Sequence, residues 1–140
     1  MPDSVLFGVR PDLVATMQAI YAEMAAENHP MRACQGVRTA EYQLALFHQG
    51  RDLPGLRRTN ADGFTIKSNH QSKSDGYGWA VDSCFTMGDP FGEDQPWDLY
   101  GAKVKAHGLI WGGDWPHFID RPHAELPGLP PSKGPQVLSA

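Results

Sequence analysis

The sequence predicts a small single domain of the α+β class, with helices packed on a short, mainly antiparallel sheet. The chain has 140 residues, and a typical domain has about 100–200 residues, so this length fits one domain. Apolar residues make up 41% and charged residues 20% of the chain, as in a protein with one ordinary core. Fifteen glycines and twelve prolines indicate that loops build much of the structure, which argues against a long helical bundle.

The first predicted element is a helix from Asp12 to about Glu27. Apolar residues recur there every three or four positions, and Pro11 stands at its start. The dipeptide His29-Pro30 ends this helix, since the residue before a proline disfavours helical backbone. The periodic pattern identifies it as a helix that packs against the core.

Two shorter helices are expected further along the chain. The first spans 40–48, with Thr39 as its N-cap and Gly50 as its terminator. The second spans 96–106 and stops before Gly108. Short apolar runs predict strands, and segments rich in glycine, proline and polar residues predict loops. The strands are expected at 31–37, 77–85, 109–111 and 124–126, the loops at 51–67 and 87–95, and a turn or loop at 112–116.

The charge and the N-terminal residues exclude several classes of protein. The formal net charge is −4, whereas a nucleic-acid-binding domain needs a basic surface. No stretch approaches the roughly 20 apolar residues that span a bilayer, so membrane insertion is not expected. Residues Met1–Gly8 lack the basic and apolar regions of a secretory signal. We therefore expect the chain to be made in a cytoplasm.

The two cysteines, Cys34 and Cys84, are too few for a zinc knuckle or a disulfide framework. They are either two small buried apolar residues or a single disulfide bridge. A cytoplasmic origin favours the first interpretation.

Three separated segments carry the residues typical of a catalytic metal site. Of the six histidines, His70 and His123 differ from the others in their surroundings. The first segment reads Ser68-x-His70, followed by Gly78-x-Ala80-x-Asp82. The second reads Asp120-x-x-His123-x-Glu125, and the third is Gly36-Val37-Arg38-Thr39-Ala40-Glu41-Tyr42-Gln43.

These segments resemble the motifs of the VanY-like D-Ala-D-Ala peptidases, a family of zinc peptidases. The tryptophan- and glycine-rich stretch at 111–115 is similar to the branch of phage endolysins that cleave the bond between L-alanine and D-glutamate. The resemblance covers about residues 33–126. In the commonest form of the first motif two residues separate the histidine from the glycine, whereas here the seven residues 71–77 do so. This polar, glycine-containing insert can loop out without moving either end.

The resemblance implies a hedgehog/D-Ala-D-Ala peptidase-like fold with a zinc cleft and assigns roles to individual residues. Zn²⁺ would be bound by His70, Asp82 and His123. Asp120 would act as general base. The alternative is that Asp120 is a loop residue that pairs with Arg121. Arg38 would stabilise the oxyanion or anchor a substrate carboxylate, or else form a surface ion pair. The residues expected to support the ligands or contact substrate are Ser68, Gln43, Trp115 and Glu125.

The chemistry of these side chains agrees with the resemblance. Catalytic zinc takes three ligands from histidine and carboxylate side chains and keeps one position open for water, whose pKa falls toward about 7. Alternation along a strand places Ala80 and Asp82 on one face, and likewise His123 and Glu125 on one face. Asp82 can therefore point into a site while its neighbours pack the core.

The function expected from the resemblance is zinc-dependent cleavage of the peptidoglycan stem peptide by a monomer. The peptidase domain would span residues 1–126, followed by a proline-rich tail at 127–140. A phage-type endolysin would accumulate in the host cytoplasm and act on the cell wall in the periplasm after release. Two alternatives remain open: a D-alanyl-D-alanine carboxypeptidase with the same site, and a zinc-stabilised binding module without activity. Asp120 favours an enzyme, because a binding module has no need of a general base.

Overall fold

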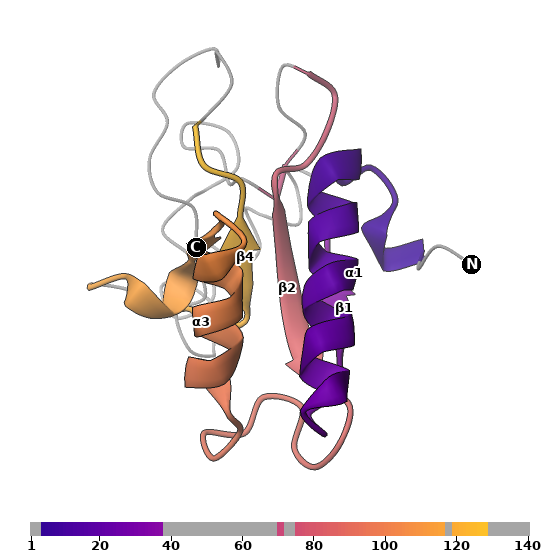
Figure 1. The fold of residues 1–140 in the computed structure, drawn as a ribbon. Coiled ribbons are helices and arrows are strands. Elements are labelled where there is room, and N and C mark those ends of the chain that lie inside the picture. Colours follow the sequence, from indigo (N-terminus) through magenta and orange to yellow (C-terminus); the bar gives the residue numbers. More distant parts are fainter. Residues whose placement is uncertain (1–3, 38–69, 72–74, 117–118, 129–140) are drawn as a thin grey trace, which may run out of the picture.

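Two helices cover one face of a four-stranded sheet in this computed structural model, which describes residues 4–37, 70–71, 75–116 and 119–128 (Figure 1). The helix α1 lies over β1 (Figure 1), and α3 contacts β3. The elements in chain order are η1 (Ser4–Leu6), α1 (Pro11–Ala26), β1 (Met31–Gln35), β2 (Ala80–Phe85), α3 (Trp97–Ala106), β3 (Ile110–Trp111), η2 (Gly112–Asp114) and β4 (His123–Glu125). The α+β class and the antiparallel sheet are confirmed.

The sheet has the strand order β1-β2-β4-β3, and every neighbouring pair is antiparallel. In the register of β2 and β4, Asp82 lies opposite His123 and Ala80 lies opposite Glu125. Residues directly opposite each other on antiparallel strands point to the same face. These four residues therefore share one face of the sheet, as the alternation of the sequence predicts.

The helix α1 forms because its apolar residues line a single face. The buried residues Leu13, Met17, Ile20 and Met24 recur at intervals of three or four, and Pro11 occupies the first turn, where its missing N–H costs nothing. The helix ends at Ala26, followed by Asn28 with φ of 67°. Asn is among the few residues that adopt this left-handed conformation readily.

The second described helix, α3, begins and ends within one residue of the predicted range and packs tightly on β3. A Cβ atom added at Gly101 would lie 2.4 Å from the Trp111 indole ring. Glycine is needed here because only a residue without a side chain lets helix and strand approach this closely.

The face of the sheet opposite the predicted site forms the hydrophobic core together with both helices. The side chains of Val81 and Ala124 are fully buried in it. Ser83 points to the same side, where its hydroxyl lies 2.6 Å from the hydroxyl of Tyr21 on α1 and accepts a hydrogen bond of 3.2 Å from Tyr100 on α3. Burial raises the pKa of both tyrosines, so their hydroxyls stay protonated. This network joins the two helices to β2.

All four strands differ from the predicted ranges. The strand β1 ends at Gln35, two residues early, and β3 begins at Ile110, one residue late. The predicted strand at 77–85 begins at Ala80, because Gly78 instead forms a parallel bridge with Val9. The strand predicted at 124–126 lies one residue earlier, at His123–Glu125. The predicted turn at 112–116 contains the short helix η2. The predicted helix at 40–48, the loop at 51–67 and most of the tail lie outside the described residues.

Both cysteines are free thiols: Cys84 is buried, and the Cys34 thiol donates a hydrogen bond of 3.3 Å to the carbonyl oxygen of Asp82. In the described part of the chain, no helix is both long enough and apolar enough to cross a bilayer.

Candidate metal centre

Three potential metal ligands converge on the face of the sheet opposite the helices. His70 Nε2 lies 3.1 Å from His123 Nδ1 and 3.2 Å from Asp82 Oδ1, and His123 Nδ1 lies 3.3 Å from Asp82 Oδ1. Asp82 and His123 come from the paired strands β2 and β4, whereas His70 lies 12 positions before Asp82 in the sequence. Local structure and sheet pairing together thus assemble the three side chains that the sequence motifs predict as ligands.

The second nitrogen of each imidazole faces a hydrogen-bond acceptor. His70 Nδ1 lies 2.8 Å from the carbonyl oxygen of Gly36, and His123 Nε2 lies 2.7 Å from Glu125 Oε1. These acceptors favour protons on the outer nitrogens, so that the inner nitrogens could act as lone-pair donors to a metal ion. Such outer partners are typical of histidines that bind metals, and they fix both ring orientation and tautomer.

The dimensions of the triangle fit a tetrahedral ion. For bond lengths of about 2.0–2.1 Å, two ligand atoms of a tetrahedral zinc ion lie roughly 3.3 Å apart. The three observed separations of 3.1–3.3 Å agree with that spacing. Two imidazole nitrogens and one carboxylate oxygen are also a donor set that suits zinc. The residues present therefore could hold a metal ion of this kind.

The electrostatics of the cluster favour a cation. Burial by itself lowers the pKa of His123, but hydrogen bonds to Asp82 and Glu125 and the charge of Asp120 raise it to about 10. Burial by itself raises the pKa of the Asp82 carboxyl. The interactions with His70 and His123 lower this pKa by more, so that it lies well below its usual range. Without a metal the site thus retains a proton, and a metal ion would take the place of that positive charge.

The two histidines of the cluster are buried, whereas the two aspartates are partly exposed. His70 and His123 are fully buried and Glu125 is 2% exposed, whereas the side chains of Asp82 and Asp120 are 13% and 17% exposed. The indole of Trp115 packs against the His123 ring, with 4.8 Å between the ring centroids. Trp115 thus packs directly against one of the proposed ligands.

Asp120 lies in a turn that holds its carboxylate beside the three ligands. Its Oδ2 atom is 3.8 Å from His123 Nδ1. The backbone N–H of Asp120 donates to the carbonyl oxygen of Gly112 at 2.9 Å, and the N–H of His123 donates back to the Asp120 carbonyl at 3.2 Å. A Cβ atom added at Gly112 would lie 2.4 Å from the Asp120 carbonyl oxygen, so only glycine permits this approach.

Three further hydrogen bonds fix the residues that follow Asp120. The Trp111 indole N–H donates to the carbonyl oxygen of Arg121 at 2.8 Å. The carbonyl oxygen of Pro122 accepts hydrogen bonds from the N–H of Ser83 at 3.0 Å and from the hydroxyl of Tyr100 at 3.3 Å. Core residues on the helix side of the sheet therefore position the turn of the site.

The second half of the polar insert forms an ordered turn. The Asp75 carboxylate accepts hydrogen bonds from the N–H of Tyr77 at 2.9 Å and from the indole N–H of Trp79 at 2.8 Å. Gly76 has a φ of +86°, a conformation that favours glycine. The insert thus ends in a fixed turn that leads into β2.

Arg38, Gln43 and Ser68 lie outside the described residues, so their predicted roles stay predictions. Asp114, another acidic residue near the motif, lies on the surface and pairs with Lys105 at 3.1 Å.

The sequence reasoning missed two supporting groups. One is the backbone carbonyl of Gly36, which carries no side-chain signal. The other is Gly112. Its position directly after Trp111, in the tryptophan- and glycine-rich stretch at 111–115, was the available sign of a close backbone contact.

Two comparisons with known proteins found similarity to this chain. The family model described as D-alanyl-D-alanine carboxypeptidase matches residues 62–126, which include all three proposed ligands, Asp120 and Glu125. Among solved structures, the Serratia marcescens L-Ala D-Glu endopeptidase ChiX matches with a TM-score of 0.57 and 24% sequence identity, over 89% of this chain and 85% of that chain. The resemblance to the D-Ala-D-Ala peptidase family is thereby confirmed over residues 62–126, and the fold is similar to that of the Serratia endopeptidase.

Proposed function

We propose that this protein is a zinc-dependent peptidoglycan peptidase that cleaves the bond between L-alanine and D-glutamate in the stem peptide. The observation that carries the proposal is the convergence of His70, Asp82 and His123 within 3.3 Å of one another, with the Asp120 carboxylate beside them. The match to a peptidase family and the similarity to a cell-wall endopeptidase support the same class of reaction.

The three ligands would hold the metal through His70 Nε2, Asp82 Oδ1 and His123 Nδ1. A bound zinc ion would supply Lewis-acid activation of water and of the scissile carbonyl. Two neutral imidazoles and one carboxylate leave a net positive charge on such a centre, which favours this chemistry. Glu125 and the Gly36 carbonyl keep both rings in the required tautomer.

Asp120 would move the proton. An ordinary aspartate has a pKa near 3.9 and is ionised at neutral pH, so its Oδ2 atom can accept a proton from the attacking water. The same oxygen can then deliver that proton to the departing amine. Its position 3.8 Å from a ligand atom and its partly exposed side chain suit both steps.

The choice of bond distinguishes the endopeptidase from its alternative. The similarity to the Serratia endopeptidase and the motif at 111–115 favour cleavage between L-alanine and D-glutamate. The description of the matching family favours removal of a terminal D-alanine. Both reactions hydrolyse an amide with the same metal and base.

Mass spectrometry of digested muropeptides tests the proposal. Zinc-loaded protein should release fragments that begin at D-glutamate and should create new α-amino groups in purified peptidoglycan. Loss of a single D-alanine would replace the endopeptidase with the carboxypeptidase. Intact sacculi and intact stem peptides after incubation would refute a peptidase altogether.

The biological setting is part of the proposal. Similarity of the motif to phage endolysins supports a protein that accumulates in a host cytoplasm and reaches the periplasmic wall after release. Expression in a Gram-negative host should leave growth unaffected until the inner membrane is permeabilised, after which the culture should lyse. Lysis that also occurs with a His70→Ala variant would show that the wall is attacked by something else.

A further inference from the structure

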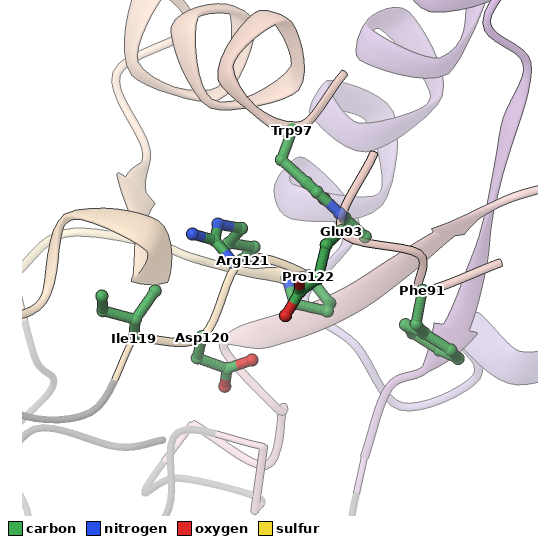
Figure 2. Close-up of a pocket in the computed structure, with 7 residues that line it drawn as sticks. All are labelled: Phe91, Glu93, Trp97, Ile119, Asp120, Arg121 and Pro122. Atoms are coloured by element: carbon green, nitrogen blue, oxygen red, sulfur yellow. The ribbon is translucent and has the colours of Figure 1, made fainter. Parts of the chain in front are cut away.

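A cavity of about 210 Å³ is lined in part by Asp120 (Figure 2), the residue whose carboxylate lies beside the proposed metal centre. It is lined by Phe91, Glu93, Trp97, Ile119, Asp120, Arg121 and Pro122. Figure 2 shows the Asp120 carboxylate at one side and Trp97 at the other, with Arg121 and Glu93 between them. Pockets for drug-sized ligands have about 300–1,000 Å³, so this cavity suits one amino-acid residue rather than a whole substrate.

In the proposed mechanism the cavity would lie on the side of the departing amine, because Asp120 delivers a proton to that amine and also lines the cavity. A substrate whose scissile bond lies at the metal centre would therefore direct the residues after the bond toward this cavity. The D-glutamate follows the bond directly, and the amino acid attached to its side-chain carboxyl group is the residue that would reach the cavity.

The walls carry one charge of each sign besides Asp120. Arg121 and Glu93 are both exposed, and within the described residues neither forms an ion pair with the other or with a third side chain. Each charged group is thus available to a ligand. A ligand with only a carboxylate would satisfy Arg121 and be repelled by Glu93, and a ligand with only an ammonium would do the reverse.

The apolar part of the lining fits an aliphatic segment between two charged ends. Phe91 and Ile119 are 54% and 56% exposed, which is high for large apolar side chains. The Trp97 indole N–H donates to the carbonyl oxygen of Gly92 at 2.8 Å, so the loop that carries Phe91 and Glu93 is tied to α3. The cavity therefore has a fixed wall on this side.

From these charges we infer that the cavity is a subsite for a residue whose side chain ends in both an ammonium and a carboxylate. Arg121 binds the carboxylate, Glu93 binds the ammonium, and Phe91 and Ile119 cover the methylene groups. Diamino acids of this kind occur in stem peptides directly after the D-glutamate. Arg121 and Glu93 are thereby specificity-determining residues, and this inference rests on the proposed endopeptidase activity.

The test compares two synthetic peptides that differ in one carboxylate. One is L-Ala-γ-D-Glu-meso-diaminopimelate, and the other carries L-lysine, which has the ammonium but no side-chain carboxylate. Because only the first peptide offers a carboxylate to Arg121, the wild type should cleave it with a kcat/KM about ten times higher. Arg121→Gln should remove this preference by slowing cleavage of the first peptide alone. Glu93→Gln should slow cleavage of both peptides.

A matched control separates a local effect from a change of net charge. Lys105→Gln removes an exposed cation that pairs with Asp114, away from the cavity, and should leave both rates unchanged. Equal cleavage of the two peptides by the wild type, or an unchanged preference in Arg121→Gln, would overturn the subsite. If the zinc-loaded wild type cleaved neither these peptides nor purified peptidoglycan, the proposed function itself would fail.

Discussion

Glu125 shows how one side chain prepares another for metal binding. Its Oε1 atom lies 2.7 Å from His123 Nε2, and its side chain is almost fully buried. The carboxylate therefore fixes the proton on Nε2 and increases the electron density at Nδ1, where the metal would bind. Removing this charge should weaken metal binding without removing a ligand.

We predict that Glu125→Gln lowers zinc affinity about 10–100-fold, the usual effect of losing an outer partner. Competition with a chromogenic chelator would measure it. Glu23→Gln is the matched control, because Glu23 also pairs with a histidine, His107, at 2.6 Å, but on the surface. Equal affinities for the wild type and Glu125→Gln would contradict the role of Glu125.

Asp120 should matter for turnover and not for metal binding. We predict that Asp120→Asn keeps zinc but loses activity by about 10²–10⁴-fold, the usual contribution of a general acid–base group. Asp114→Asn, at a nearby exposed position, should retain full activity. Zinc content and peptide hydrolysis would be measured on the same samples. An active Asp120→Asn enzyme would remove Asp120 from the mechanism.

At the scale of the elements, the short helix η2 and strand β4 position the turn between them. Gly112 approaches this turn so closely that a Cβ atom would meet the Asp120 carbonyl oxygen at 2.4 Å and the His123 Cβ atom at 2.9 Å. Backbone atoms cannot move aside as a flexible side chain does. A methyl group at this position should therefore displace both the base and a ligand.

We predict that Gly112→Ala lowers both zinc affinity and activity while the chain remains folded. Gly108→Ala is the control, because Gly108 has a φ of +82° and no atom within 4 Å of an added Cβ. That variant should lose about 1 kcal/mol of stability from backbone strain and keep its zinc affinity. The idea fails if Gly112→Ala binds zinc as tightly as the wild type.

The contact between the helices and β2 depends on Ser83. We predict that Ser83→Ala lowers the free energy of unfolding by about 1–3 kcal/mol, because the buried Tyr21 hydroxyl loses its partner. Tyr21→Phe added to Ser83→Ala should recover part of that loss, since no unsatisfied hydroxyl remains. Urea unfolding of the single and double variants would measure this, and strictly additive effects would contradict the coupling.

At the scale of the whole molecule, the two faces of the sheet have different roles, one in the hydrophobic core and one at the proposed metal centre. One face carries Val81, Ser83 and Ala124 into the helix-covered core, and the other carries Asp82 and His123 into the metal centre. Because the ligands come from separate parts of the chain, a bound ion would link them only in the folded state. Metal binding should therefore stabilise the fold.

We predict that zinc raises the Tm of chelator-treated protein by roughly 10 °C when its concentration is about 100 times the Kd, which corresponds to about 2.7 kcal/mol. Differential scanning fluorimetry would measure the shift. His70→Ala should abolish it, and His107→Ala, on the surface beside Glu23, should preserve it. A shift of the same size in His70→Ala would place the metal elsewhere.

Much of the fold was predictable because its signals are local. The range of α1 follows from apolar spacing and a proline at each end, and that of α3 from Gly108. The strand β4 was predicted one residue late, because three residues provide too short a pattern to fix a boundary. The motifs single out the proposed ligands His70, Asp82 and His123, although the sequence does not give their separations.

The sequence by itself determined the α+β class and the residue types of the site, because periodicity and motif spacing are properties of the chain. Only the tertiary structure decided how the site is supported. The Gly36 carbonyl behind His70, the Gly112 contact with Asp120 and the cavity between Glu93 and Arg121 join residues far apart in sequence. Such contacts depend on strand register and helix packing, and no local pattern records them.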